Sequence, residues 1–368
     1  MPISPYDPKQ LHPLFPRFCP CRACSYYLKP DNCITKDGTY PVLKGVERRQ
    51  RLYCHGGKHR FSETAYSPLF GHHGSFKEYV QTAKMTAQGL STEQIADILE
   101  RDGRTILEWQ KALGQKSESF HLALCTLIGL TLMSIQMDEI WSYLQKKKRL
   151  LWLFITLEAQ TKFWVNFELG SRTSHTAHRL LRNLVVLMPR GFEHFLLVTT
   201  DKLAAYEKAI AKYFEKVRYA YLQIVKQRRK RRLVTVKQRI VQGKPADFGH
   251  KTKNTSYIER FNLTLRQKVS YLQRKTLGYC KNQKNFEWVL WINLFDYNYR
   301  QFHQSLRQDL TGTSQKFKRR YQHLTPAMKM GLTSTQLEWR DLIVAPIAVG
   351  AASLTAETAH NFTTSTNL

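Results

Sequence analysis

Apolar positions between residues 133 and 169 predict three neighbouring β-strands. The runs MSIQMDEIWSYL, LLWLFITLEA and KFWVNFEL are rich in β-branched and aromatic residues, and turn-like breaks at 146–149 and 160–161 separate them. Such runs with short breaks between them are typical of antiparallel neighbours. The pattern therefore predicts an antiparallel meander.

The apolar spacing changes after this meander. Residues 174–188 have the spacing of an amphipathic helix, and residues 192–201 form a buried-strand pattern that ends at Asp201. Strands followed by a helix and a further strand predict a mixed sheet covered by helices. The weakly polar run 120–137 is long enough to cross a membrane, but its polar members favour a buried helix followed by a strand.

Helical spacing also governs residues 75–115. Ser91 and Gln94 form a Ser-x-x-Gln capping box at the start of the second helix, and a break at 102–103 precedes a third. The expected buried positions are Tyr79, Ala83 and Ala87 in the first helix and Ile95, Ile98 and Leu99 in the second. A helix, a turn and a further helix with Arg104, Thr105 and Trp109 near its start match a helix-turn-helix that reads DNA. The alternative is a small helical bundle that never contacts DNA.

Four of the seven cysteines lie between residues 19 and 33, a concentration that favours metal binding over disulfides in a cytosolic chain. Two ligand-rich turns, at 19–24 and 54–59, can supply a tetrahedral zinc site. The candidate ligands are Cys19, Cys24, Cys54 and His59, with Cys21 and His55 as alternatives to Cys19 and His59. Gly57 stands where a second C-x2-C pair would place a cysteine, so the alternative is a turn that has lost its metal. Cys33 fits a strand pattern and is expected to pack.

Composition adds a strong charge bias to this globular pattern. Lys and Arg number 57 against 28 for Asp and Glu, which gives a net charge of +29. An excess of this size favours nucleic-acid phosphates as the partner, over an anionic membrane or a merely basic surface. Residues 216–286 contain only two acids, Asp247 and Glu259, and their densest basic run is 226–232. A solvated basic loop is the alternative interpretation of that run.

Three carboxylates stand out by position. Asp138 lies within the first predicted strand, Asp201 ends a strand, and Glu259 shares a helix face with Asn262. Three converging carboxylates repel one another unless a divalent cation lies among them, and Mg²⁺ prefers such oxygen ligands. Each acid taken alone fits a cap or a surface position equally well.

The segment from Asn254 to Lys281 contains NTSYIERFNLTLRQKVSYLQRKTLGYCK, and MDEIWSY and TDKLAAYE surround Asp138 and Asp201. These three blocks resemble those of transposases of the insertion-sequence-one family, and the N-terminal turns and helices suit that family as well. The resemblance extends to about Leu310. It implies a ribonuclease-H-like catalytic domain whose triad, Asp138, Asp201 and Glu259, binds two Mg²⁺ ions for DNA cleavage and strand transfer.

The combined prediction is a multidomain α+β protein. Its parts are a zinc-ribbon-like module at 1–70, a helix-turn-helix at 74–116, a ribonuclease-H-like mixed α/β domain at 130–343 and a flexible tail at 344–368. The expected partners are the DNA of the element's ends and its target, together with further copies of the chain. The first residues lack the pattern of a secretory signal, and the resemblance places the protein in the cytoplasm, associated with the nucleoid.

Basic residues around this chemistry are expected to bind DNA. The candidates are Arg104, Thr105, Trp109, Lys226, Arg228, Arg229, Arg260, Arg266, Arg274 and Lys275. The rival functions are a DNA-binding transcriptional regulator, a transposase relative without activity, and a Mg²⁺ nuclease of the same fold that does not join strands.

Overall fold

A computed structural model describes residues 19–27, 33–42, 47–229, 232–249, 254–274, 279–310 and 320–345, with backbone only at 228, 229, 232 and 233. Lys275 and the predicted tail from 346 onward lie outside the described residues. The described residues up to Ala123, with those from Leu337 onward, form one compact unit. Those from Leu124 to Gln336 form a second unit.

The first unit begins with a small antiparallel sheet. Its strands, in spatial order, are β1 (Ile34–Val42), β2 (Glu47–Cys54) and β3 (His59–Ser62). Ile34 and Leu52 pack with Cys19 and Cys54 in a compact core. A core this small leaves a need for further stabilisation, which a metal can supply.

Four helices complete the first unit: α1 (Phe76–Ala87), α2 (Thr92–Leu99), α3 (Gly103–Ile128), which continues into the second unit, and α9 (Trp339–Val344). The predicted capping box at Ser91 and Gln94 is confirmed, with both reciprocal hydrogen bonds present. The predicted burial of Tyr79, Ala83, Ala87 and Ile95 is also confirmed.

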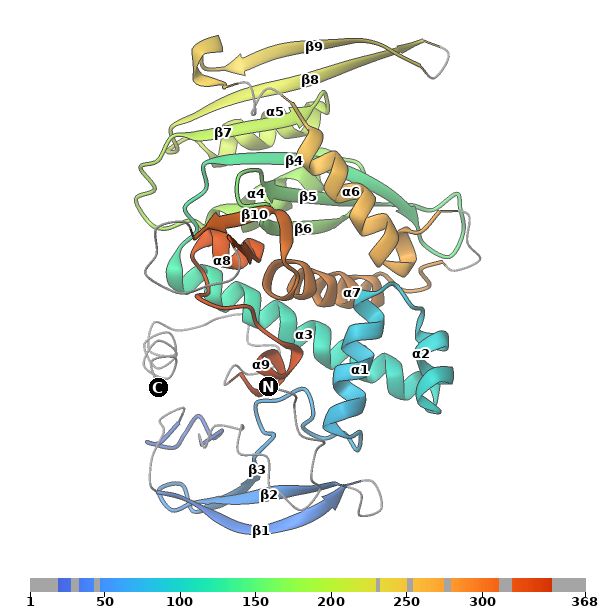
Figure 1. Cartoon of the computed structure of the whole chain (residues 1–368), viewed down its shortest axis with the longest axis vertical. Coiled ribbons are helices and arrows are strands. Elements are labelled where there is room, and N and C mark those ends of the chain that lie inside the picture. Colours follow the sequence, from blue (N-terminus) through green and yellow to red (C-terminus); the bar gives the residue numbers. More distant parts are fainter. Residues whose placement is uncertain are drawn as a thin grey trace. The chain divides into compact units, whose positions relative to one another are not determined.

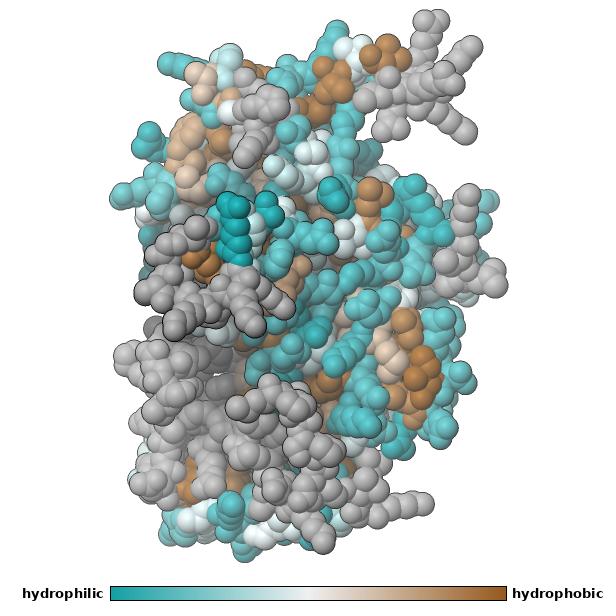
Figure 2. Space-filling view, in the orientation of Figure 1, coloured by the Kyte–Doolittle hydropathy of each residue, from teal (hydrophilic) through white to brown (hydrophobic). Residues whose placement is uncertain are grey.

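Ile98 was predicted to be buried and is 57% exposed. The buried face of the two-turn helix α2 is centred between Ile95 and Ala96, and Ile98 points about 110° away from that centre at 100° per residue. A hydrophobic patch lies over α2 in Figure 2. The spacing of apolar residues was therefore right for the helix but wrong for the extent of its buried face.

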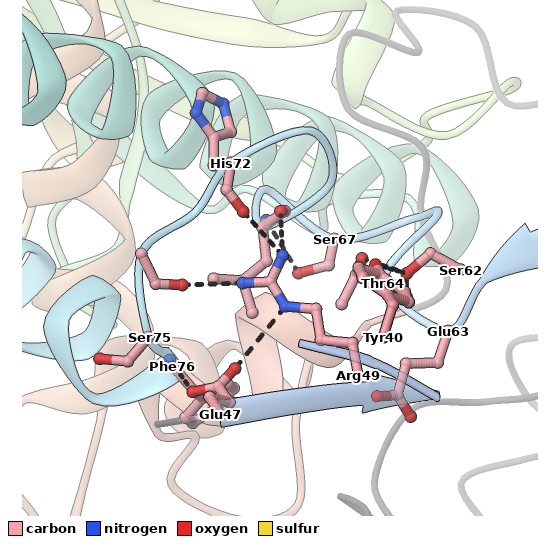
Figure 3. A network of polar contacts seen from close by, with 12 residues as sticks. Tyr40, Glu47, Arg49, Ser62, Glu63, Thr64, Ser67, His72, Ser75 and Phe76 are labelled. Carbon is pink, nitrogen blue, oxygen red and sulfur yellow. Dashed lines mark hydrogen bonds and ion pairs between the residues drawn. The ribbon is translucent and has the colours of Figure 1, made fainter. Parts of the chain in front are cut away.

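A buried arginine joins the small sheet to the start of α1 (Figure 3). The Arg49 guanidinium donates to the carbonyl oxygens of Leu69, His72 and Gly74 at 3.0, 2.8 and 2.7 Å. It also pairs with Glu47, whose other oxygen accepts the Phe76 N–H at 3.0 Å. The network satisfies backbone groups of the segment that leads into α1, which would otherwise be costly to bury.

The second unit is built on a six-stranded sheet. Its spatial order is β6 (Trp164–Gly170), β5 (Leu150–Glu158), β4 (Ser134–Tyr143), β7 (Leu196–Asp201), β8 (Tyr219–Arg229) and β9 (Arg232–Gln242). The three strands β4, β5 and β6 are antiparallel neighbours, as the meander prediction required. Strands β4, β7 and β8 are parallel to one another, and β9 pairs antiparallel with β8. The described residues of the basic run, 226–229 and 232, therefore lie in paired strands, whereas the alternative interpretation was a solvated loop.

Helices cover both faces of this sheet (Figure 1). Helix α6 (Ser256–Lys268) crosses one face, and α4 (Ser174–Leu187) and α5 (Ala204–Tyr213) lie against the other. The remaining elements are α7 (Gln283–Phe295), the π-helical turn Asp296–Arg300, the hairpin β10 (His303–Asp309) and β11 (Tyr321–Leu324), α8 (Pro326–Met330), and the 3₁₀ turns Pro245–Asp247 and Ser270–Leu272. The mixed sheet with helices on both faces confirms the predicted α/β architecture of this unit.

The apolar run 120–137 divides as predicted, because α3 ends at Ile128 and β4 begins at Ser134. Within the described residues, none of the helices combines the length and the apolar character that a membrane crossing needs.

Candidate active site and metal centres

Asp138 and Asp201 lie side by side at one edge of the sheet. Asp138 is in β4, and Asp201 is the last residue of its parallel neighbour β7. Their strands are aligned so that Met137 faces Thr200, one residue before each aspartate. Oxygen atoms of Asp138, Glu139 and Asp201 lie within 4.8 Å of one another. The structure therefore brings two of the three predicted carboxylates together.

The start of α6 is bound to β4 by a glutamine. The Gln136 side chain donates to the Asn254 carbonyl at 2.8 Å and accepts the Ile258 N–H at 2.9 Å. Gln136 and Asp138 point to the same face of their strand, since side chains alternate along it. Glu259 follows Ile258 directly, so these bonds place it over the face that carries Asp138.

Glu259 lies near the aspartates but outside their close group. Among the described residues, the carboxylates that lie within 4.8 Å of one another here are those of Asp138, Glu139 and Asp201, without Glu259. The Glu259 carboxylate instead accepts hydrogen bonds from Lys226 and from Thr255, both to Oε1. Its charge still acts on Asp138, whose pKa it helps to raise.

Glu139 is a carboxylate of the site that the sequence did not single out. Its side chain is only 2% exposed, and Arg172 donates to its Oε2 from Nε at 3.2 Å and from Nη2 at 3.0 Å. The same guanidinium lies 3.6 Å from Asp201 and over the ring of Trp152. The place of Glu139 directly after Asp138 in MDEIWSY is the only signal in the sequence that points to it.

The crowded carboxylates hold protons more tightly than free ones. Burial, followed by the charges of Asp201 and Glu259, raises the pKa of Asp138 to about 6. Burial and the two aspartates raise the pKa of Glu139 to about 7. A divalent cation would offset this repulsion, and an all-carboxylate donor set suits a hard ion such as Mg²⁺. The residues present therefore fit the metal that the resemblance implies.

The first unit contains a second group of ligand atoms. Cys24 Sγ lies 3.7 Å from Cys54 Sγ, and Cys19 Sγ lies 3.3 Å from His59 Nε2. A tetrahedron with Zn–S bonds of about 2.3 Å has S–S edges of about 3.8 Å, so these separations fit a bound zinc. The backbone N–H of Tyr26 donates to Cys24 Sγ and lowers the pKa of that thiol, which favours the thiolate that zinc needs.

The geometry favours Cys19 over Cys21 and His59 over His55 as zinc ligands. His59 lies outside the close group of three thiols but contacts Cys19. The close thiol group includes Cys19 and not Cys21. His55 is occupied elsewhere, with Nε2 at 3.1 Å from the Thr35 hydroxyl. A Cβ at Gly57 would lie 2.5 Å from the His59 ring, so the glycine that interrupts the cysteine pair leaves room for a histidine ligand.

Of the three DNA contacts predicted near the start of α3, two lie at least partly at the surface and one lies in the core. Arg104 is exposed and Thr105 half-buried, and both line a hollow of about 580 Å³ at the start of α3. Trp109 is 2% exposed and packs on Tyr79, with ring centroids 4.7 Å apart. Its burial argues against the predicted contact with DNA, because the ring forms part of the core of this unit.

The other predicted DNA contacts lie around α6. Arg260 and Arg274 are exposed and Arg266 is half-buried, whereas Lys226 pairs with Glu259. Hydrophilic residues predominate over α6 in Figure 2, as a DNA-facing helix requires. The side chains of Arg228 and Arg229, and the whole of Lys275, lie outside the described part of the chain.

The mixed sheet and the paired aspartates are compatible with a ribonuclease-H-like domain of a DDE enzyme, a class that cleaves and joins DNA strands. Residues 131–247 match the model of a family described as IS1 transposase. This match confirms the resemblance seen in the sequence and supports a DDE transposase of the IS1 family. It includes Asp138 and Asp201 and ends before α6. Comparison with curated proteins gives no match.

Proposed function

We propose that the protein binds the ends of an insertion sequence and catalyses Mg²⁺-dependent DNA cleavage and strand transfer through Asp138, Asp201 and Glu259. The observation that supports this most strongly is the pair of aspartates on neighbouring parallel strands, within the segment that matches the IS1 transposase family. Glu259 completes the set through the sequence block that surrounds it and through its place over the same face of the sheet.

The three carboxylates would hold two Mg²⁺ ions. Bound metal would supply activation of the attacking water and stabilisation of the leaving 3′ oxygen, and the freed 3′-hydroxyl would then attack target DNA. The charges of Asp201 and Glu259 both act on Asp138, which would contribute to both ions. Asn262 orients Asp138 by donating from Nδ2 to Oδ2 at 2.8 Å.

The surrounding features have proposed roles as well. The exposed Arg104 and Thr105 at the start of α3 would contact the element's ends, as in a helix-turn-helix. Arg260, Arg266 and Arg274 would bind phosphates near the cleavage site. Cys19, Cys24, Cys54 and His59 would hold a structural zinc ion. Recombination brings two DNA ends together, so we propose a homo-oligomer on DNA.

The test incubates the purified protein with Mg²⁺ and DNA that carries both edges of the element. Wild type should cut and join, while Asp138→Asn, Asp201→Asn and Glu259→Gln should bind the DNA without cutting it. Glu215→Gln, which neutralises an exposed acid beyond α5, is the matched control and should retain activity.

Each other outcome identifies a rival. Full cutting by any of the three variants would remove that residue from the triad. Binding without cutting by wild type would favour a regulator or an inactive relative. Cutting without joining would favour a nuclease of the same fold.

A further inference from the structure

We infer that Lys226 is a positioning residue of the active site. Its ammonium pairs with the Glu259 carboxylate before metal binds and competes with a divalent ion for that carboxylate. The inference rests on the proposed function. It assigns Lys226 a place within the active site, whereas the sequence suggested only a general phosphate contact.

Strand pairing explains how Lys226 reaches the site. Strand β8 lies beside β7, with Ile224 directly opposite Asp201. Lys226 lies two residues further along β8 and therefore points to the same face as Ile224, just past the end of β7. Its ammonium pairs with Oε1 of Glu259, the oxygen that also accepts the Thr255 hydroxyl.

Both side chains of the pair are partly exposed, so the pair is accessible to exchange. The Lys226 side chain is 31% exposed and that of Glu259 is 45% exposed. An ion pair with this exposure contributes little to stability and is readily opened. A doubly charged ion held by additional carboxylates can therefore displace the ammonium.

The charges around the three acids follow one pattern. Glu259 faces Lys226, and Asp201 faces Arg172 at 3.6 Å. The hydrogen bonds that the described residues donate to Asp138 come instead from neutral groups, the Glu139 N–H and the Asn262 amide. Glu259 and Asp201 are thus paired with basic side chains of the chain itself, and Arg172 is shared between Asp201 and Glu139. Asp138 has no ion pair among the described residues, although the charge of Lys226 also acts on it.

Removing Lys226 should strengthen metal binding, because the competing ammonium and its repulsion of the cation both disappear. For a divalent ion several Å from a unit charge near the surface, the expected change is on the order of tenfold in Kd. A lysine that only contacts DNA phosphate would leave metal binding without DNA unchanged.

The experiment titrates the full-length protein with Mn²⁺ in the absence of DNA and measures free Mn²⁺ by electron paramagnetic resonance. Lys226→Met should bind Mn²⁺ about tenfold more tightly than wild type, and Lys226→Arg should bind it about as wild type does. Lys237→Met is the matched control: it removes the same charge from β9, but Lys237 aligns with Val225 and so points to the opposite face of the hairpin.

Equal or weaker Mn²⁺ binding by Lys226→Met would overturn the inference, as would an equal gain in Lys237→Met. Asp138→Asn separates this result from the proposed function. If Asp138→Asn abolishes Mn²⁺ binding while Lys226→Met has no effect, the metal site stands and only the role of Lys226 is lost. If Asp138→Asn binds Mn²⁺ as wild type does, the proposed metal site itself fails.

Discussion

The amide of Asn262 on α6 donates from Nδ2 to Oδ2 of Asp138 on β4, at 2.8 Å. Asn262 lies three residues after Glu259, so one face of the helix presents both side chains to the sheet. This hydrogen bond orients a carboxylate on which the charges of the two other proposed metal ligands both act. Groups of this kind, which orient a ligand without touching the metal, strongly affect metal sites.

Asn262→Ala should therefore lower Mg²⁺-dependent cleavage by about 10- to 100-fold, because Asp138 loses its oriented partner. Binding of the element's end, measured by gel shift without metal, should stay within about twofold of wild type. Leu263→Ala is the control on the same helix, since Leu263 is 63% exposed and makes no part of the site. Unchanged cleavage by Asn262→Ala would contradict the role given to this contact.

The raised pKa values of Asp138 and Glu139 predict a pH-dependent stability of the metal-free protein. The folded chain keeps protons on these groups up to about pH 6 and 7, whereas in the unfolded chain they dissociate near pH 4. These two groups should therefore lower the free energy of unfolding progressively as pH rises from about 4 through 7.

The measurement is chemical denaturation between pH 5 and 8 in the presence of a chelator. Other groups titrate in the same range, so the informative quantity is the difference between wild type and the Asp138→Asn, Glu139→Gln double variant. The double variant should show a smaller fall in stability across this range. The same slope in both proteins would show that the two carboxyl groups are not perturbed as described.

Local patterns in the sequence predicted much of the second unit. The meander, the helix after it and the strand that ends at Asp201 follow from periodicity that neighbouring residues impose. The closeness of Asp138 and Asp201 needed one further step, because it depends on β4 and β7 being parallel neighbours. The resemblance to a known family supplied that step.

Contacts between distant segments could not be predicted in this way. Lys226 and Glu259 are 33 positions apart and meet only because β8 lies beside β7 and α6 crosses the sheet. The dense positive charge around Lys226 is typical of a solvated loop and concealed a strand. Trp109 shows a related limit, since helical spacing places an aromatic ring near a recognition position without telling whether it faces the solvent or the core.

The cysteine group makes a prediction about metal content. Purified wild type should contain about one zinc ion per chain, and Cys24→Ser and His59→Ala should contain close to none, because a tetrahedral structural site needs all four ligands. Elemental analysis by mass spectrometry measures this directly. Loss of zinc should also lower the Tm of the first unit, whose small sheet has little other core.

Two matched variants distinguish the ligand sets. Cys21→Ser and His55→Ala should both retain zinc, because Cys21 lies outside the close thiol group and His55 contacts the Thr35 hydroxyl. If Cys21→Ser loses the metal and Cys19→Ser keeps it, the C-x2-C pair is the true ligand pair. If wild type contains no zinc and Cys24→Ser behaves identically, packing alone holds these turns.

The contacts of Arg49 predict a large effect of this residue on the stability of the first unit. Arg49→Met should lower the free energy of unfolding of the first unit by about 3–5 kcal/mol, since Glu47 would remain buried without its partner and three carbonyl groups would lose theirs. Hydrogen exchange of the β2 amides under increasing urea reports this unit separately from the second one.

The neighbouring Arg48 provides the control for this experiment. It is exposed and bonds to Thr39, so Arg48→Met should change stability by no more than about 0.5 kcal/mol. The Glu47→Gln, Arg49→Met double variant should lose less than the sum of the two single changes, because the second substitution removes the charge that the first leaves unpaired. Additive losses would mean that the carbonyl contacts, and not the buried ion pair, account for the effect of Arg49.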